Sequence, residues 1–169
     1  FKKNKAGGGV LITQNSHLID LMIWFFGMPK SINAETKNIY SKEVEDEVNA
    51  EFTYDSFRGM LETSWSKEGY RNLVTNIEIQ FDKGSIKVDE DELEIKDNLI
   101  VKKINKISSF TPNFYDLAGD YYSSQFNSFI DSIENNIKNT NDIDDSLNIH
   151  NVIETFYFSS NKKKRIKLD

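Results

Sequence analysis

Four side chains near the N-terminus have the types and the spacing of a catalytic face. They recur at i, i+4, i+7 and i+11, so that a helix brings them to one side, and they are Thr13, His17, Asp20 and Trp24. An imidazole exchanges protons near neutral pH, and a carboxylate one turn away can orient it. The alternative is structural, because a lone histidine on an apolar helix is commonly a core residue, for which Asp20 would be the partner.

The segment that carries these side chains reads as one helix with a glycine-rich start and a clear stop. Residues 1–8 are polar and glycine-rich and predict a loop, and the apolar residues that follow predict a largely buried helix. Gly27 is suited to the C-terminal cap and Pro29 to the stop beyond it. The glycines at 7–9 allow a positive φ or a close backbone approach, but they do not match the dinucleotide fingerprint G-x-G-x-x-G.

The stretch GGGVLITQNSHLIDLMIWFFGMP resembles a segment of the glucose–fructose oxidoreductase/inositol dehydrogenase (Gfo/Idh/MocA) family, G-G-G-x-L-x-D-x-x-x-H-x-x-D-x-x-x-x-x-x-G. The rest of the chain follows the same plan, so the resemblance covers nearly all 169 residues. It implies that residues 1–169 are a single substrate-binding and dimerisation domain, the C-terminal domain of an NAD(P)-dependent oxidoreductase. The N-terminal Rossmann domain of that family is absent from this chain.

The same resemblance implies roles for particular residues. Hydride would pass between NAD or NADP, bound mainly by the missing Rossmann domain, and a carbon of a sugar, nucleotide sugar or polyol. His17 matches the acid/base histidine, and Thr13 stands where many members have an aspartate. Because threonine cannot take a proton, the acid/base work would rest on His17 and on a lysine of the missing domain, or else activity is changed or lost. Asp20 matches the second acidic position and would orient or contact substrate, and the segment where cofactor, substrate and backbone meet would be Gly7, Gly8 and Gly9.

A second candidate patch follows a predicted strand and turns at Gly69. Two aromatic side chains could stack on a sugar or base ring, and two cations could bind a carboxylate or phosphate: Trp65, Tyr70, Lys67 and Arg71. An ordinary hairpin loop with aromatic packing explains the same residues. Tyr121, just before the apolar face of a long helix, is a third candidate for a substrate contact.

Hydrophobic periodicity predicts the elements that must position these residues. A period of two indicates strands at 31–40, 48–54, 58–66, 73–81, 85–88, 92–95 and 99–104. A period of 3.6 indicates helices at about 120–138 and 147–160, the second capped by Asp144 or Asp145, before a closing strand at 165–168. The predicted fold is α+β, an open-faced, predominantly antiparallel mixed sheet of roughly five to seven strands with helices packed on one face.

The face of the sheet that helices leave uncovered decides how the domain associates. If that face carries Leu61, Trp65 or Ile77, its apolar area predicts a homodimer through the open sheet face, as the family resemblance also implies. Polar residues keep the alternative open that this face stands alone in water: Glu51, Glu62, Glu78 and Gln80.

Composition excludes several classes of function. The chain has 21 lysines and arginines against 27 aspartates and glutamates, a net charge of −6 that argues against a nucleic-acid partner. It has no cysteine, and its two histidines are far apart, so no metal site is predicted; His150 is taken as structural or exposed. No signal peptide or membrane-spanning run is found, so we expect a cytoplasmic protein. Because the chain begins at Phe1 without methionine, we expect it to be part of a longer protein and to be inactive alone.

Two other functions compete with the oxidoreductase reading. One is a catalytically inactive sugar-binding or dimerisation module of the same fold, for which Thr13 marks the loss of chemistry. The other is a hydrolase that uses His17 and Asp20. It lacks a nucleophile, because Ser16 lies on a different face of the helix.

Overall fold

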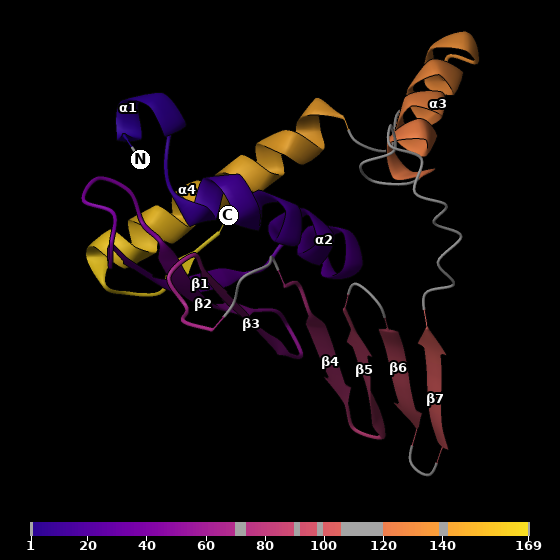
Figure 1. Ribbon diagram of the computed structural model, residues 1–169, viewed down its shortest axis with the longest axis horizontal. Helices are drawn as coiled ribbons and strands as arrows, with labels where there is room; N and C mark the ends of the chain where they lie inside the picture. The colour runs from indigo at the N-terminus through magenta and orange to yellow at the C-terminus, as the bar shows by residue number, and fades with distance from the viewer. Residues whose placement is uncertain are drawn as a thin grey trace. The chain divides into compact units, whose positions relative to one another are not determined.

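The structure, a computed structural model, describes residues 2–69, 74–89, 92–97, 100–105, 120–138 and 142–168 (Figure 1). The chain divides into two compact units, Phe1–Lys67 with Lys138–Asp169 (unit 1) and Glu68–Ile137 (unit 2), which are described separately. The predicted α+β class is confirmed, and the pairings between described strands are antiparallel. None of the described helices has the length and apolar character needed to cross a membrane.

Unit 1 is built on a four-stranded sheet in the order β3-β2-β1-β8. Its strands are β1 (Ser31–Lys37), β2 (Glu47–Thr53), β3 (Arg58–Ser64) and β8 (Ile166–Lys167). Its helical elements are α1 (Lys3–Ala6), the π-helix η1 (Leu11–Asn15), α2 (Ser16–Phe26) and α4 (Ile143–Lys162). The predicted loop at 1–8 therefore contains one helical turn, which the amide of Gly7 closes onto the carbonyl of Lys3 at 2.9 Å.

The core of unit 1 lies between this sheet and the helices α2 and α4, which lie on one side of it in Figure 1. The period of two along β2 buries Val48, Ala50 and Phe52, as predicted. The ring of Phe52 meets that of Phe156 from α4 edge-on at 5.4 Å between centroids, and Ile19 from α2 is fully buried. Apolar burial of this kind is the main force that holds the two helices on the sheet.

Helix α4 also satisfies backbone donors of β1. The hydroxyl of Ser159 accepts the amide of Ala34 at 2.9 Å, and the hydroxyl of Ser160 accepts that of Thr36 at 3.0 Å. The short strand β8 pairs only with Ser31 and Ile32 of β1. The two serines thus occupy the stretch of the β1 edge that β8 leaves open, which protects it from pairing with another chain.

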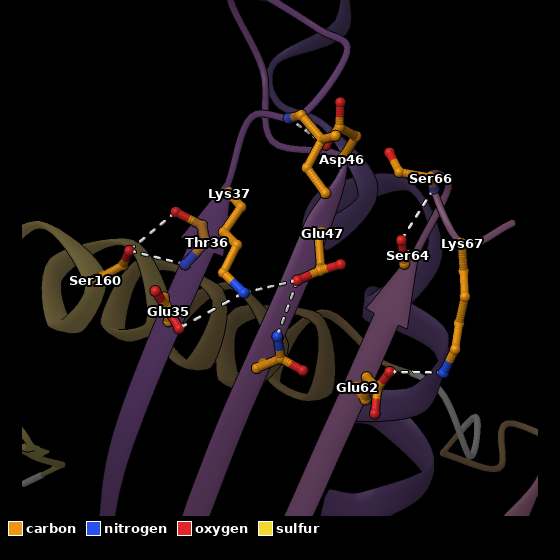
Figure 2. A network of polar contacts seen from close by, with 12 residues as sticks. Glu35, Thr36, Lys37, Asp46, Glu47, Glu62, Ser64, Ser66, Lys67 and Ser160 are labelled. Carbon is orange, nitrogen blue, oxygen red and sulfur yellow. Dashed lines mark hydrogen bonds and ion pairs between the residues drawn. The ribbon is translucent and has the colours of Figure 1, made fainter.

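The outer face of the unit 1 sheet is charged rather than apolar (Figure 2). Leu61, a candidate for an exposed apolar face, is only 5% exposed and belongs to the core. Glu51 and Glu62 lie on the outer face, so in unit 1 this face carries polar side chains where apolar ones were considered. The ion pairs of this face include Lys37–Glu47, Lys37–Glu35, Lys67–Glu62, Arg58–Glu51 and Arg165–Glu51.

Unit 2 contains a second four-stranded sheet, in the order β4-β5-β6-β7. Its elements are β4 (Ile77–Phe81), β5 (Gly84–Val88), β6 (Glu92–Asp97), β7 (Ile100–Asn105) and the helix α3 (Asp120–Glu134). The register places Ile77, Val88 and Leu93 on one face, and Glu78, Lys87 and Glu94 on the other, where Lys87 and Glu78 form an ion pair. The described strands thus form two sheets of four strands, where one sheet of five to seven was predicted.

One predicted helix end is confirmed and another needs correction. Helix α2 ends at Phe26 with Gly27 at φ 75°, whose amide donates to the carbonyl of Ile23, as predicted. Helix α4 begins four residues earlier than predicted, and its N-cap is Asp142 rather than Asp144 or Asp145. The correct cap was missed because three aspartates follow one another within four positions, and only backbone geometry selects among them.

Candidate functional site

The glycine segment is held by one buried carboxylate. Glu45, in the connection between β1 and β2, accepts the amides of Gly9 at 2.9 Å and Leu11 at 3.1 Å with Oε1, and its backbone carbonyl accepts that of Val10 at 3.0 Å. The side chain of Glu45 is buried. A Cβ on Gly9 would overlap the carbonyl oxygen of Glu45, so only glycine permits this approach.

Asp46 continues the same junction toward β3. Its backbone carbonyl accepts the amide of Trp65 at 2.8 Å, and the carbonyl of the preceding residue, Glu45, accepts the amide of Val10. The dipeptide 45–46 therefore links the glycine segment to the start of the second candidate patch. Sequence reasoning missed both acids, because nothing in a run of charged residues indicates which of them are buried.

The side of the helix that was predicted to be catalytic is open to solvent. Thr13 and His17 are exposed, Asp20 is partly buried, and Trp24 is 76% exposed. The helix is therefore not largely buried. Within α2 only Ile19 is buried, because one side of the helix packs on the sheet and the other does not. In the described part of the chain, the side chains of His17 and Asp20 make no hydrogen bond or ion pair, so the structural alternative of a paired core histidine is not realised.

Thr13 is tied to the glycine segment. Its hydroxyl donates to the carbonyl of Gly9 at 2.9 Å, and its amide donates to the same carbonyl at 3.2 Å. A donor already engaged in this way leaves the Thr13 oxygen as an acceptor for a ligand hydroxyl. Thr13 and His17 are four residues apart, so their side chains are neighbours on the helical surface.

A family model described as the GFO/IDH/MocA C-terminal domain matches residues 1–87. That match contains the glycine segment, Glu45, the face of Thr13 and His17, and the strands β1 to β4. The chain belongs to the GFO/IDH/MocA C-terminal domain family. No curated protein sequence matches it.

Solved structures of oxidoreductases share the fold of this GFO/IDH/MocA domain. Levoglucosan dehydrogenase in complex with NADH and levoglucosan aligns with a TM-score of 0.86 and 18% identity, over 99% of this chain and 52% of that one. An aldose-aldose oxidoreductase from Caulobacter crescentus complexed with glycerol aligns with a TM-score of 0.80 and 18% identity, over 98% of this chain and 49% of that one. The WlbA dehydrogenase from Bordetella pertussis, in complex with NADH and UDP-GlcNAcA, aligns with a TM-score of 0.72 and 20% identity, over 96% of this chain and 46% of that one. The domain spans about half the length of these proteins.

The second candidate patch is only partly described in the GFO/IDH/MocA domain. Trp65 is 37% exposed, and the ammonium of Lys67 donates to Glu62 at 2.9 Å on the outer face of the sheet, away from α2 (Figure 2). Tyr70 and Arg71 lie outside the described residues, as does the side chain of Tyr121, whose backbone belongs to α3. The structure therefore does not bring Lys67 to the face of His17.

The residues of this domain fit the reacting end of a nicotinamide cofactor better than its phosphates. The amides of residues 9–11 all donate to Glu45, so they are not free for a pyrophosphate. Gly8 and Gly9 are buried against the domain itself, with Tyr157 beside Gly8, and Gly7 is exposed at φ 77°. An open imidazole beside an acceptor hydroxyl suits a substrate alcohol. In the described residues no group of histidines and acids could hold a metal ion.

Proposed function

We propose that this domain supplies the substrate-binding and acid/base side chains of an NAD(P)-dependent oxidoreductase that acts on a sugar, a nucleotide sugar or a polyol by hydride transfer. The observation that carries this proposal is that Thr13 and His17 are both exposed, four residues apart on one helical segment of a GFO/IDH/MocA domain. Its structural neighbours include dehydrogenases in complex with NADH, which supports the proposal. A Rossmann domain outside this chain would bind the cofactor.

In this proposal His17 handles the proton. During oxidation the substrate hydroxyl gives its proton to the imidazole while its carbon loses a hydride, and a carbonyl forms. A bound nicotinamide supplies the hydride acceptor. Thr13 accepts a hydrogen bond from a second substrate hydroxyl, and Asp20 orients the substrate from the next turn of the helix.

Further contacts belong to the same proposal. Of the segment Gly7, Gly8 and Gly9, only Gly7 is exposed, so Gly7 would make the van der Waals approach to the cofactor, while the two buried glycines shape the segment. The side chains proposed to contact substrate beyond the helix are Trp65, Tyr70, Arg71 and Tyr121, without Lys67, whose ammonium donates to Glu62 on the outer face of the sheet. We also propose that two copies associate as a homodimer through the open sheet face.

A catalytically inactive binding module is the second candidate. Its support is Thr13, which cannot take a proton and whose hydroxyl is already engaged with Gly9. If Thr13 marks a loss of chemistry, the exposed face would still bind sugars through the same groups.

The deciding experiment compares two histidine variants of the full-length protein that contains this chain. We expect turnover of NAD or NADP with a sugar or polyol, and a fall in kcat of about 10²–10⁴-fold for His17→Ala, the range typical of a lost acid/base group. His150→Ala is the matched control, because His150 is exposed on α4 and should leave kcat unchanged.

The other outcomes separate the alternatives. If the full-length protein turns over and His17→Ala is as active as the parent, the assignment of His17 is wrong. Sugar binding without turnover by either cofactor would favour the inactive module.

A further inference from the structure

Glu45 acts as a cap for the helical segment that carries the proposed site. The first amides of a helix have no partner within it. Here the amides of three consecutive residues, 9 to 11, all donate to Glu45, two to its carboxylate and one to its carbonyl. A negative charge at this end also complements the helix dipole. Glu45 lies 36 residues away from Gly9 in the sequence, so this cap joins two distant parts of the chain.

Helix α4 holds the carboxylate in place. The phenol of Tyr157 donates to the same Oε1 of Glu45 at 2.9 Å. Burial, the charge of Glu45 and this hydrogen bond all raise the pKa of Tyr157, so the phenol stays protonated as a donor. Since a Cβ on Gly9 would overlap the backbone of Glu45, the two segments are also in close steric contact.

The contacts continue from Glu45 to the site. Its carboxylate accepts the amide of Gly9, and the carbonyl of Gly9 accepts both the amide and the hydroxyl of Thr13. His17 follows one turn later on the same face. A shift of the glycine segment would therefore move Thr13 directly and His17 with it.

We propose that Glu45 is a positioning residue that sets where Thr13 and His17 lie along the helix axis, with Tyr157 holding its carboxylate. We call the contacts of Glu45 with the amides of residues 9–11 and with Tyr157 the clamp. This proposal rests on the proposed function, because the clamp would serve the substrate chemistry of His17. A displacement of about 1 Å in such a site can lower a rate by about 10²-fold.

The test uses Glu45→Ala and Glu45→Gln in the full-length protein, with two measurements. Hydrogen exchange of the peptide that covers residues 8–17 reports the clamp without any need for turnover. The values of kcat and KM report its effect on the reaction. Glu43→Gln is the matched control, because Glu43 lies in the same loop, is exposed, and among the described residues accepts only the amide of Lys3 at the start of α1.

We expect Glu45→Ala to speed exchange in residues 8–17 and to lower kcat by about 10²-fold while KM changes by less than about threefold. Glu45→Gln should keep exchange in residues 8–17 and kcat close to the values of the parent, because its amide oxygen can still accept the backbone donors. Glu43→Gln should match the parent. If Glu45→Ala does not fold, Tyr157→Phe removes only the phenol donor and should change both measurements in the same direction.

Two results would overturn the clamp: unchanged exchange in residues 8–17, or faster exchange spread evenly over unit 1, which would mean a general loss of stability. Local exchange that rises without any fall in kcat would overturn the positioning role. A parent protein without turnover would instead refute the proposed function, and the exchange measurement would still decide whether Glu45 holds the segment.

Discussion

At the scale of single residues, Asp46 organises the connection between β1 and β2. One carboxylate oxygen accepts the amide of Ile39, and the other accepts those of Tyr40 and Ser41, each at 2.8 Å. Burial works to raise the pKa of Asp46, but the hydrogen bonds from these amides outweigh it, and the pKa lies below its usual value. The ionised form of Asp46 is therefore the one that stabilises the fold.

We expect Asp46→Asn to lower the free energy of unfolding near neutral pH by about 1–3 kcal/mol, because the amide keeps one acceptor oxygen for three donors. Because the pKa of Asp46 is lowered in the folded state, its contribution to stability is fully present above the unfolded-state pKa, about 3.9. That contribution is lost as the pH falls through the lower folded-state value. Urea unfolding from about pH 7 down to about pH 3 should show the gap between parent and variant closing at the acid end.

Asp82→Asn, in the exposed turn between β4 and β5, is the control and should show no such change. A gap for Asp46→Asn that stays constant over the whole range would mean that ionisation of Asp46 does not contribute to stability.

At the scale of elements, α4 links the sheet edge to the site, since it carries Ser159, Ser160 and Tyr157. It starts with a reciprocal capping box. Asp142 accepts the amides of Asp144 at 3.0 Å and Asp145 at 3.2 Å, and the amide of Asp142 donates to the Asp145 carboxylate at 3.2 Å. This capping box stabilises the first turn of the helix that carries the two serines and the tyrosine.

We expect Asp142→Ala to lower the free energy of unfolding by about 0.5–2 kcal/mol, the usual loss for an N-cap. Asp144→Ala should have a smaller effect of about 0.3–1 kcal/mol, because Asp144 acts only through its charge near the helix start. Denaturant unfolding followed by circular dichroism measures both. Equal losses for the two variants would argue that the capping geometry of Asp142 is not what matters.

At the scale of the whole molecule, each unit has a sheet with one charged face. In unit 1 that face is the one opposite the helices, and its charges are largely paired within the chain. Met60 stands out there as an apolar side chain that is 74% exposed. A two-fold homodimer brings the same patch of both copies together, so one substitution in that patch changes the interface twice.

If the homodimer forms through this face, as proposed, we expect Met60→Lys to weaken it by at least about tenfold in Kd, because two added charges oppose each other and a polar contact replaces an apolar one. Met28→Lys is the matched control: Met28 is also exposed, but it precedes β1 and is not on the sheet face. Sedimentation equilibrium gives the Kd of each variant. An unchanged mass for Met60→Lys at all concentrations would rule this face out as the interface.

The sequence by itself determined the features that depend on near neighbours in the chain. The alternation of Val48, Ala50 and Phe52 predicts β2, Gly27 predicts the end of α2, and the spacing of Thr13 and His17 places them on one face. The glycine and histidine pattern also led to the right family. Each of these depends on residues within a few turns of one another, where backbone periodicity alone decides the outcome.

Only the tertiary structure decided which polar groups are buried and against what. Glu45 meets Gly9 across 36 positions and Tyr157 across 112, and no local pattern distinguishes it from the exposed Glu43 beside it. The same holds for the charged outer face of the sheet, because whether Leu61 lies inside or outside depends on where α2 and α4 pack. A buried carboxylate is stable only when distant parts of the chain bring donors to it, and that meeting exists only in the folded chain.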